Sequence, residues 1–104
     1  MVFKELAENT GLDEDEFLEM VELFLEVGSS DLNKLQSAID EENVQEVIEA
    51  AHSIKGASGN MGFMEIFEVA KGVEVKARED SLDGAAEAVK SIKEKLDLIA
   101  ETLR

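Results

Sequence analysis

The chain contains no cysteine, no proline and no tyrosine, and only 7 of its 104 residues are glycine. Without cysteine it can form neither a disulfide framework nor a thiolate metal site. The absence of proline removes the strongest helix breaker, and the scarcity of glycine adds to the same bias. Alanine, leucine, glutamate and lysine dominate instead, so the composition predicts an all-α fold.

Targeting and membrane-spanning signals are also missing from the sequence. The first five residues lack the basic and apolar regions of a secretory signal. No apolar run approaches the roughly 20 residues that a helix needs to cross a bilayer. A length of 104 residues is enough for one domain with a modest core. We therefore expect a single cytoplasmic domain over residues 1–104.

Negative charge dominates the chain, whose formal net charge is −15 at pH 7. This charge argues against nucleic acid and anionic membrane surfaces as partners, because both would be repelled. The carboxylates are concentrated in residues 1–50, whereas residues 51–78 carry a slight excess of basic side chains. That excess is either chance variation among solvated helix faces or a local site for an anion or an acidic partner.

Apolar residues recur at helical spacing along most of the chain. A short helix is expected over residues 2–8. A long helix follows over residues 14–39, with Asp13 as its N-cap and Glu16 in the capping-box position.

The second half of the chain predicts three more helices. Asn43 caps the third helix, which three glycines should bring to an end: Gly56, Gly59 and Gly62. The fourth helix covers residues 63–79, and Asp80 or Ser81 then caps a last helix that continues almost to the end of the chain. Four long amphipathic helices joined by short turns bury their apolar stripes most simply as an antiparallel four-helix bundle, with the short N-terminal helix across one end. Because such a bundle closes within one chain, we expect a monomer.

His52 is the only histidine, so acid–base or nucleophilic chemistry near neutral pH has very few other candidates. On a helical wheel it lies at the edge of the apolar stripe, where one ring nitrogen can face water. Gly56 and Gly59 follow on the same face, and each costs roughly 1 kcal/mol relative to alanine inside a helix. That cost is explained either by a partner that approaches bare backbone beside His52 or simply by the end of the helix.

Two charged residues are candidates to support His52. Lys55 follows at i+3, where its ammonium could stabilise negative charge added to the ring, although spacing alone favours a solvated surface lysine. Glu74 interrupts the apolar stripe of the fourth helix, and a carboxylate at the edge of a core needs a partner. If the third and fourth helices pair, Glu74 can accept the Nδ1 hydrogen of His52 and leave Nε2 as an exposed nucleophile. Otherwise its carboxylate reaches water or pairs with Lys71 or Arg78.

Residues 51–63, AHSIKGASGNMGF, resemble the signature of histidine phosphotransfer (HPt) domains, in which a histidine is followed by x-x-Lys-Gly and a second glycine. The Gly-Asn-Met-Gly-Phe end is most similar to the phosphotransfer domain of chemotaxis histidine kinases. The resemblance extends back through residues 23–26 to the start of the long helix and forward at least to Glu74, which is about two thirds of the chain. It implies that His52 accepts and donates a phosphoryl group and that Lys55 stabilises this group. It also implies that Glu74 hydrogen-bonds the histidine.

The resemblance also implies partners. These are response-regulator receiver domains, for which Gly56 leaves room, and a histidine kinase, hybrid or otherwise. We expect docking through Gly56, Gly59 and apolar surface near the histidine, such as Met61 or Phe63. The domain would carry phosphoryl groups in a phosphorelay without kinase activity of its own, and it would need no cofactor or metal.

Three other functions compete with this interpretation. Glu49-x-x-His52 has the ligand spacing of carboxylate-bridged di-iron bundles, but such a site needs two of these pairs and the chain has one histidine. The glycines of residues 56–62 do not form a nucleotide-binding P-loop, because the terminal Gly-Lys-Ser/Thr and the preceding strand are missing. A non-catalytic adaptor bundle with a structural His52 stays open as the alternative.

Overall fold

The computed structural model describes residue 11 and residues 13–103 of the chain. Four α-helices make up most of this part: α2 (Glu14–Asp40), α3 (Val44–Met61), α4 (Met64–Arg78) and α5 (Ala85–Thr102). The described residues contain no strand, which confirms the predicted all-α class. None of their helices is long and apolar enough to span a membrane. The short helix expected over residues 2–8 lies outside the described residues.

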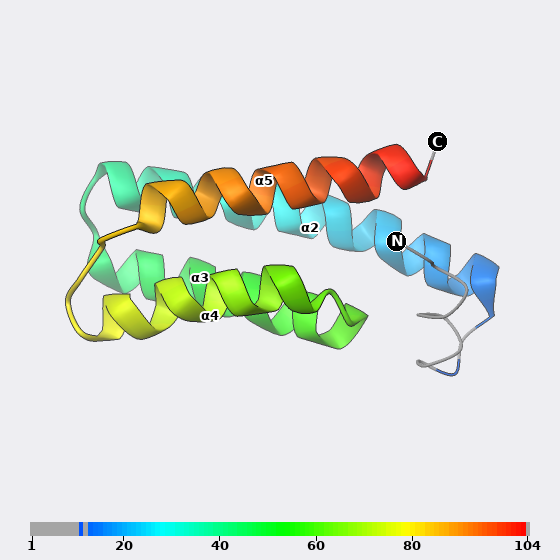
Figure 1. Ribbon diagram of the computed structural model, residues 1–104, viewed down its shortest axis with the longest axis horizontal. Helices are drawn as coiled ribbons and strands as arrows, with labels where there is room; N and C mark the ends of the chain where they lie inside the picture. Colours follow the sequence, from blue (N-terminus) through cyan, green and yellow to red (C-terminus); the bar gives the residue numbers. More distant parts are fainter. Residues whose placement is uncertain (1–10, 12, 104) are drawn as a thin grey trace.

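The four helices form an antiparallel bundle (Figure 1). α2 packs against α3 and α5, and α4 packs against the same two helices. Each turn between α2, α3 and α4 is only two or three residues long, so these helices must be antiparallel neighbours. α3 and α5 therefore occupy diagonal corners, and the outer face of α3 points away from α5.

Side-chain caps start the first two of these helices where the sequence predicts. Asp13 accepts a hydrogen bond from the Glu16 backbone N–H at 2.8 Å, and Asn43 accepts one from the Glu46 N–H at 3.1 Å. Each cap satisfies a backbone donor that the first turn of a helix leaves unpaired. The two caps explain why α2 and α3 begin at residues 14 and 44.

Only one of the three glycines near the end of α3 stops the helix. Gly62 has φ of 80°, a left-handed conformation that suits glycine, and the Phe63 N–H donates to the Ser58 carbonyl at 2.9 Å. α3 continues through Gly56 and Gly59. A Cβ at Gly59 would lie 3.1 Å from Cδ2 of Phe67 on α4. Gly59 therefore lets α3 and α4 approach closely.

The predicted start of the last helix at Asp80 or Ser81 is wrong. Asp80 has φ of 63°, and the Ser81 N–H donates back to the Lys76 carbonyl at 2.9 Å. Both features belong to the end of α4 rather than to the start of another helix. The chain needs three more residues to turn, and Gly84, with φ of 76°, directly precedes the first residue of α5.

The core fills the space between the four helices. Its largest fully buried side chains come from all of them: Phe17, Leu35, Ile54, Ile66, Ile92 and Ile99. At the corner between α3 and α4, the ring of Phe63 packs against Phe24 of α2 with centroids 5.1 Å apart. α3 packs against α2 on one side and α4 on the other. This packing fixes the positions of the residues on the outer face of α3.

Candidate functional site

His52 lies on the outer face of α3. Its neighbours Ala51 and Ile54 are buried in the core, while 62% of the His52 side chain is exposed. The ring Nδ1 lies 3.0 Å from Oε2 of Glu74, on α4. This is the contact that pairing of the third and fourth helices predicts from the sequence. Within the described part of the chain, the ring makes no other hydrogen bond, which leaves Nε2 open to a reaction partner.

Glu74 is the centre of the site. Its carboxylate is buried, with 5% of the side chain exposed. Oε2 accepts hydrogen bonds from Arg78, at 2.7 Å from Nη2 and 3.2 Å from Nε, as well as the contact with His52. Oε1 makes no well-angled hydrogen bond, but the Lys55 ammonium lies 2.9 Å away and compensates its charge. The pairing with His52 and the pairing with Arg78, which the sequence leaves as alternatives, occur together.

The surroundings of Glu74 hold its carboxyl group ionised. Burial is the largest single effect and acts to raise the pKa, because a charged carboxylate loses hydration inside the protein. The donors Lys55, Arg78 and His52 outweigh it together and lower the pKa from 4.5 to about 2. The carboxylate is therefore ionised at neutral pH, and with its two cations it leaves one net positive charge beside the histidine.

The ionised state of Glu74 determines the tautomer of His52. A carboxylate without a proton can only accept hydrogen bonds, so the ring nitrogen that faces it must carry the hydrogen. That nitrogen is Nδ1, and in the neutral ring Nε2 then keeps its lone pair. The geometry thus leaves Nε2 exposed with a free lone pair, while Nδ1 on the other side of the ring contacts the buried carboxylate.

The two cations have different positions around this acid. Lys55 is mostly covered, with 26% of its side chain exposed, whereas 58% of Arg78 is exposed. The sequence singles out Lys55 but treats Arg78 only as a competitor for Glu74. Its i+4 spacing from Glu74 is the signal that places it in the site, because residues four apart share one face of a helix.

The other predicted docking residues divide into two groups. Gly56 is exposed, and a Cβ there would meet no atom within 4 Å, so bare backbone faces solvent one turn after His52. Gly59 instead faces Phe67. Met61 and Phe63 have exposures of 5% and 4% and belong to the core, so neither offers docking surface. Both side chains belong to the hydrophobic core next to the corner at Gly62, where Phe63 packs against Phe24 of α2.

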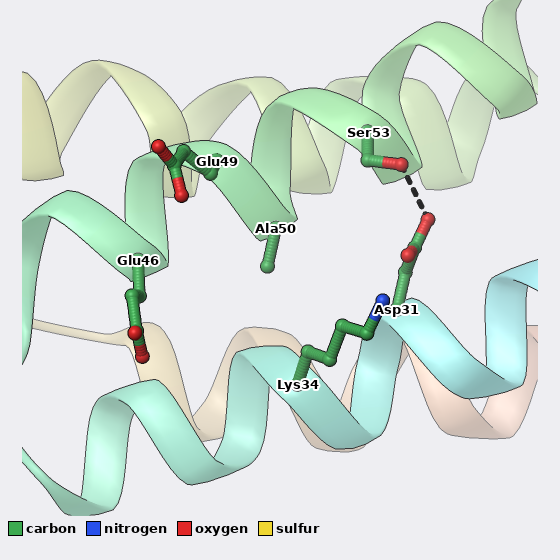
Figure 2. Close-up of a pocket in the computed structure, with 6 residues that line it drawn as sticks. All are labelled: Asp31, Lys34, Glu46, Glu49, Ala50 and Ser53. Carbon is green, nitrogen blue, oxygen red and sulfur yellow. Dashed lines mark hydrogen bonds between the residues drawn. The ribbon is translucent and has the colours of Figure 1, made fainter.

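On the side of His52 that faces away from α4, the site borders a hollow between α2 and α3 (Figure 2). Ser53, next to His52, donates a hydrogen bond to the buried carboxylate of Asp31 on α2 at 2.5 Å. The hollow has a volume of about 410 Å³, and Glu46 and Glu49 line it from α3. The described residues contain no group of three or more histidine, cysteine, aspartate or glutamate side chains that could hold a metal ion. The ligand set that a di-iron site requires is therefore not assembled around Glu49 in this part of the chain.

Comparison with known proteins identifies the class of domain that this bundle and site define. The family model of the Hpt domain matches residues 19–102, and the chain belongs to this family. Among solved structures, the crystal structure of histidine-containing phosphotransfer protein B (HptB) from Pseudomonas aeruginosa PAO1 superposes with a TM-score of 0.84. The two proteins share 26% sequence identity over 94% of this chain and 85% of the other. A search of curated protein sequences finds no match.

Proposed function

We propose that this protein is a phosphoryl carrier of a two-component phosphorelay, in which Nε2 of His52 exchanges a phosphoryl group with the aspartate of a response-regulator receiver domain. The observation that carries the proposal is the 3.0 Å contact between His52 Nδ1 and the buried Glu74 carboxylate. It orients one nitrogen inward and leaves the other exposed. Membership of the Hpt family supports the same function, and the similar protein HptB is described as a histidine-containing phosphotransfer protein.

The transfer requires no proton to move. The Nε2 lone pair attacks the phosphorus of the aspartyl phosphate, a P–N bond forms, and the P–O bond breaks with its electron pair going to the aspartate carboxylate. The ring keeps its hydrogen on Nδ1 and becomes positively charged, and Glu74 balances that charge at 3.0 Å. In the reverse step a carboxylate attacks the phosphorus and the P–N electron pair returns to Nε2. Neutral imidazole leaves, with Nδ1 still protonated.

Lys55 and Arg78 supply the positive charge of the carrier's half of the site. Both pair with Glu74 in the unphosphorylated protein, at 2.9 Å and 2.7 Å respectively. A phosphoryl group on His52 brings new negative oxygens close to them, and charge-assisted hydrogen bonds to such oxygens are about twice as strong as neutral ones. The two cations then share their charge between Glu74 and the phosphoryl group. The carrier has no kinase role in this scheme, and a histidine kinase upstream supplies the phosphoryl group.

A non-catalytic adaptor bundle accounts less well for the site. Burying a carboxylate costs free energy, and an adaptor would have no use for one that holds an exposed histidine by Nδ1. Charged groups of this kind, arranged in one place with a strongly shifted pKa, are typical of functional sites. No feature of the described residues favours the adaptor over the carrier.

Phosphoryl transfer from a panel of labelled, phosphorylated receiver domains tests the proposal. The wild-type protein should take up label that is labile in acid and stable in base, as a phosphohistidine is, and the His52→Gln variant should take up none. Circular dichroism of both proteins controls for folding. If no receiver labels the wild type, or if the variant is labelled equally, the carrier function is wrong and the adaptor becomes the better account.

A further inference from the structure

One cation near His52, Lys71, pairs with no acid in the described part of the chain. It lies on α4 three residues before Glu74, and its side chain is exposed. Residues three apart on a helix are neighbours, so an ion pair with Glu74 is within reach. The ion pairs among the described residues nevertheless use other cations. The ammonium group of Lys71 is therefore unpaired although it lies close to the site.

The register of α3 and α4 places Lys71 beside His52. Gly59 approaches Phe67 at one end of this interface. Seven residues away along each helix, His52 contacts Glu74. Lys71 lies between these two contacts, on the face of α4 that meets α3, and less than one helical turn of about 5.4 Å from the level of Glu74. The flexible four-carbon stem of a lysine spans such a distance, so the ammonium can reach a group bound to His52.

The charge of Glu74 explains why Lys71 stays unpaired. The Lys55 ammonium lies 2.9 Å from Oε1 of Glu74, and Nη2 of Arg78 lies 2.7 Å from Oε2. These two cations already exceed the single negative charge of the carboxylate, so a third cation gains nothing from approaching the group. Lys71 thus keeps its full charge available in the unphosphorylated protein.

The charges around His52 differ between the two sides of α3. On the α4 side, three cations accompany the one carboxylate of Glu74: Lys55, Lys71 and Arg78. On the α2 side, the hollow in Figure 2 is lined by one cation and three carboxylates: Lys34, Asp31, Glu46 and Glu49. A phosphoryl group on Nε2 carries negative charge, so it is repelled by the α2 side and attracted to the α4 side. Part of the basic excess of residues 51–78 therefore lies where a phosphoryl group would need it.

The lack of a partner makes Lys71 respond to phosphorylation more fully than the other two cations. Lys55 and Arg78 must divide their charge between Glu74 and the phosphoryl group. Lys71 gives up no ion pair when it binds phosphoryl oxygens, so it gains an interaction that exists in the phosphorylated state alone. An interaction made in only one of two states shifts the equilibrium towards that state.

We propose that Lys71 is a phosphoryl-binding residue of this carrier and that it sets how the phosphoryl group is divided between His52 and the receiver aspartate. The inference rests on the proposed function. The transfer step itself is unchanged, because Lys71 gives and takes no proton and acts through its charge. The sequence alone treats this lysine only as an alternative partner of Glu74.

The equilibrium constant of transfer, measured with a phosphorylated receiver that labels the wild type, tests the inference. Lys71→Ala should lower the ratio of labelled carrier to labelled receiver roughly fivefold, the upper range for an exposed ion pair. Lys71→Arg keeps the charge and should restore most of the ratio, and high salt should reduce the difference between wild type and Lys71→Ala. Lys90→Ala is the matched control. Lys90 is also exposed and forms no ion pair with the described residues, but it lies on α5, diagonally across the bundle from α3.

A second measurement needs no receiver. Phosphorus NMR of protein labelled by the small donor phosphoramidate follows the pH at which the phosphoryl group takes up its last proton. A nearby cation favours the more negative form, so this pH should be higher in Lys71→Ala than in wild type and in Lys90→Ala. Nitrogen NMR of the unphosphorylated His52 ring should be the same in all three proteins, because Lys71 does not hold Glu74. The inference requires both results.

The equilibrium constant separates binding of the phosphoryl group from contact with the receiver. A residue that only contacts the receiver changes the forward and reverse rates by the same factor and leaves the equilibrium between the free proteins unchanged. An unchanged equilibrium constant in Lys71→Ala would therefore overturn the inference while the carrier function stands. An equal fall in Lys90→Ala would also overturn it, since the net charge of the protein would then be the cause. If no receiver labels the wild-type protein, the carrier function fails, and this inference fails with it.

Discussion

The Glu74 carboxylate holds the Nδ1 side of His52 at 3.0 Å across the interface between α3 and α4, although the two residues are 22 positions apart in the chain. The contact joins a buried acid to an exposed imidazole. The contact depends directly on the fold, because α3 and α4 must pack in one register for the two groups to meet.

Substitution of Glu74 should slow phosphorylation of His52 while the protein stays folded. Glu74→Ala removes a charge-assisted hydrogen bond worth about 1.5–3 kcal/mol, which corresponds to a rate roughly 10 to 100 times lower if the bond acts in the transition state. Glu74→Gln keeps an acceptor for the Nδ1 hydrogen and should recover part of the rate. Transfer kinetics with a receiver, together with nitrogen NMR of the ring tautomer, measure both effects. Equal rates in wild type and both variants would remove Glu74 from the mechanism.

The stability of the fold should depend on Glu74 in acid. Its pKa of about 2 in the folded protein lies below the ordinary value of 4.5, so the ionised carboxylate stabilises the fold above about pH 4.5. This contribution is lost as the pH falls from about 4.5 to about 2, and its full size is about 3 kcal/mol. Urea unfolding over this range should show a steeper loss of stability for wild type than for Glu74→Gln. Identical pH profiles would mean that the carboxylate is not held ionised in the way described.

The two glycines inside α3 should respond differently to alanine. Gly56→Ala meets no atom within 4 Å and should stabilise the helix by up to about 1 kcal/mol through higher helix propensity. Gly59→Ala gains the same propensity but pushes against the Phe67 ring at 3.1 Å, so it should be about 1–2 kcal/mol less stable than Gly56→Ala. Chemical unfolding measures this difference. In transfer kinetics, Gly56→Ala should be the slower of the two variants, because a methyl group at residue 56 stands where the receiver approaches.

Removal of either cation should slow phosphoryl transfer without preventing it. Lys55→Ala and Arg78→Ala each leave the other cation next to Glu74, so each should lower the rate by roughly tenfold, the effect of about 1.4 kcal/mol. The double variant leaves the buried carboxylate with only His52 as a partner and should lose more than either single variant. Steady-state kinetics with one receiver compare all four proteins. Wild-type rates in both single variants would show that neither cation contributes.

Much of the fold follows from local patterns in the sequence. An apolar period of 3.6 residues runs through all four described helices, although Glu74 interrupts it in α4, and the caps at Asp13 and Asn43 have unambiguous spacing. The start of α5 could not be predicted in this way. It depends on Asp80, which takes a left-handed backbone conformation after α4 that a pattern of side chains does not indicate.

The parts of the site that depend on one pair of helices can be predicted from the sequence. The parts that depend on the packing of three helices cannot. His52, Lys55 and Glu74 come together because α3 and α4 form a hairpin about Gly62, whose register can be counted. The burial of Met61 and Phe63 depends on α2 as well, since Phe24 packs against that corner. The simultaneous pairing of Glu74 with Arg78 does not follow from the sequence for another reason: one carboxylate oxygen can accept more than one hydrogen bond, so Oε2 contacts both His52 and Arg78.

The position of the phosphoryl group on the His52 ring tests the central claim most directly. Phosphorus and nitrogen NMR of the labelled wild-type protein distinguish a phosphoryl group on Nε2 from one on Nδ1. Because Glu74 occupies the Nδ1 side, the account predicts phosphorylation on Nε2 alone, with Nδ1 protonated and hydrogen-bonded to Glu74. A phosphoryl group on Nδ1, or on any residue other than His52, would contradict the account.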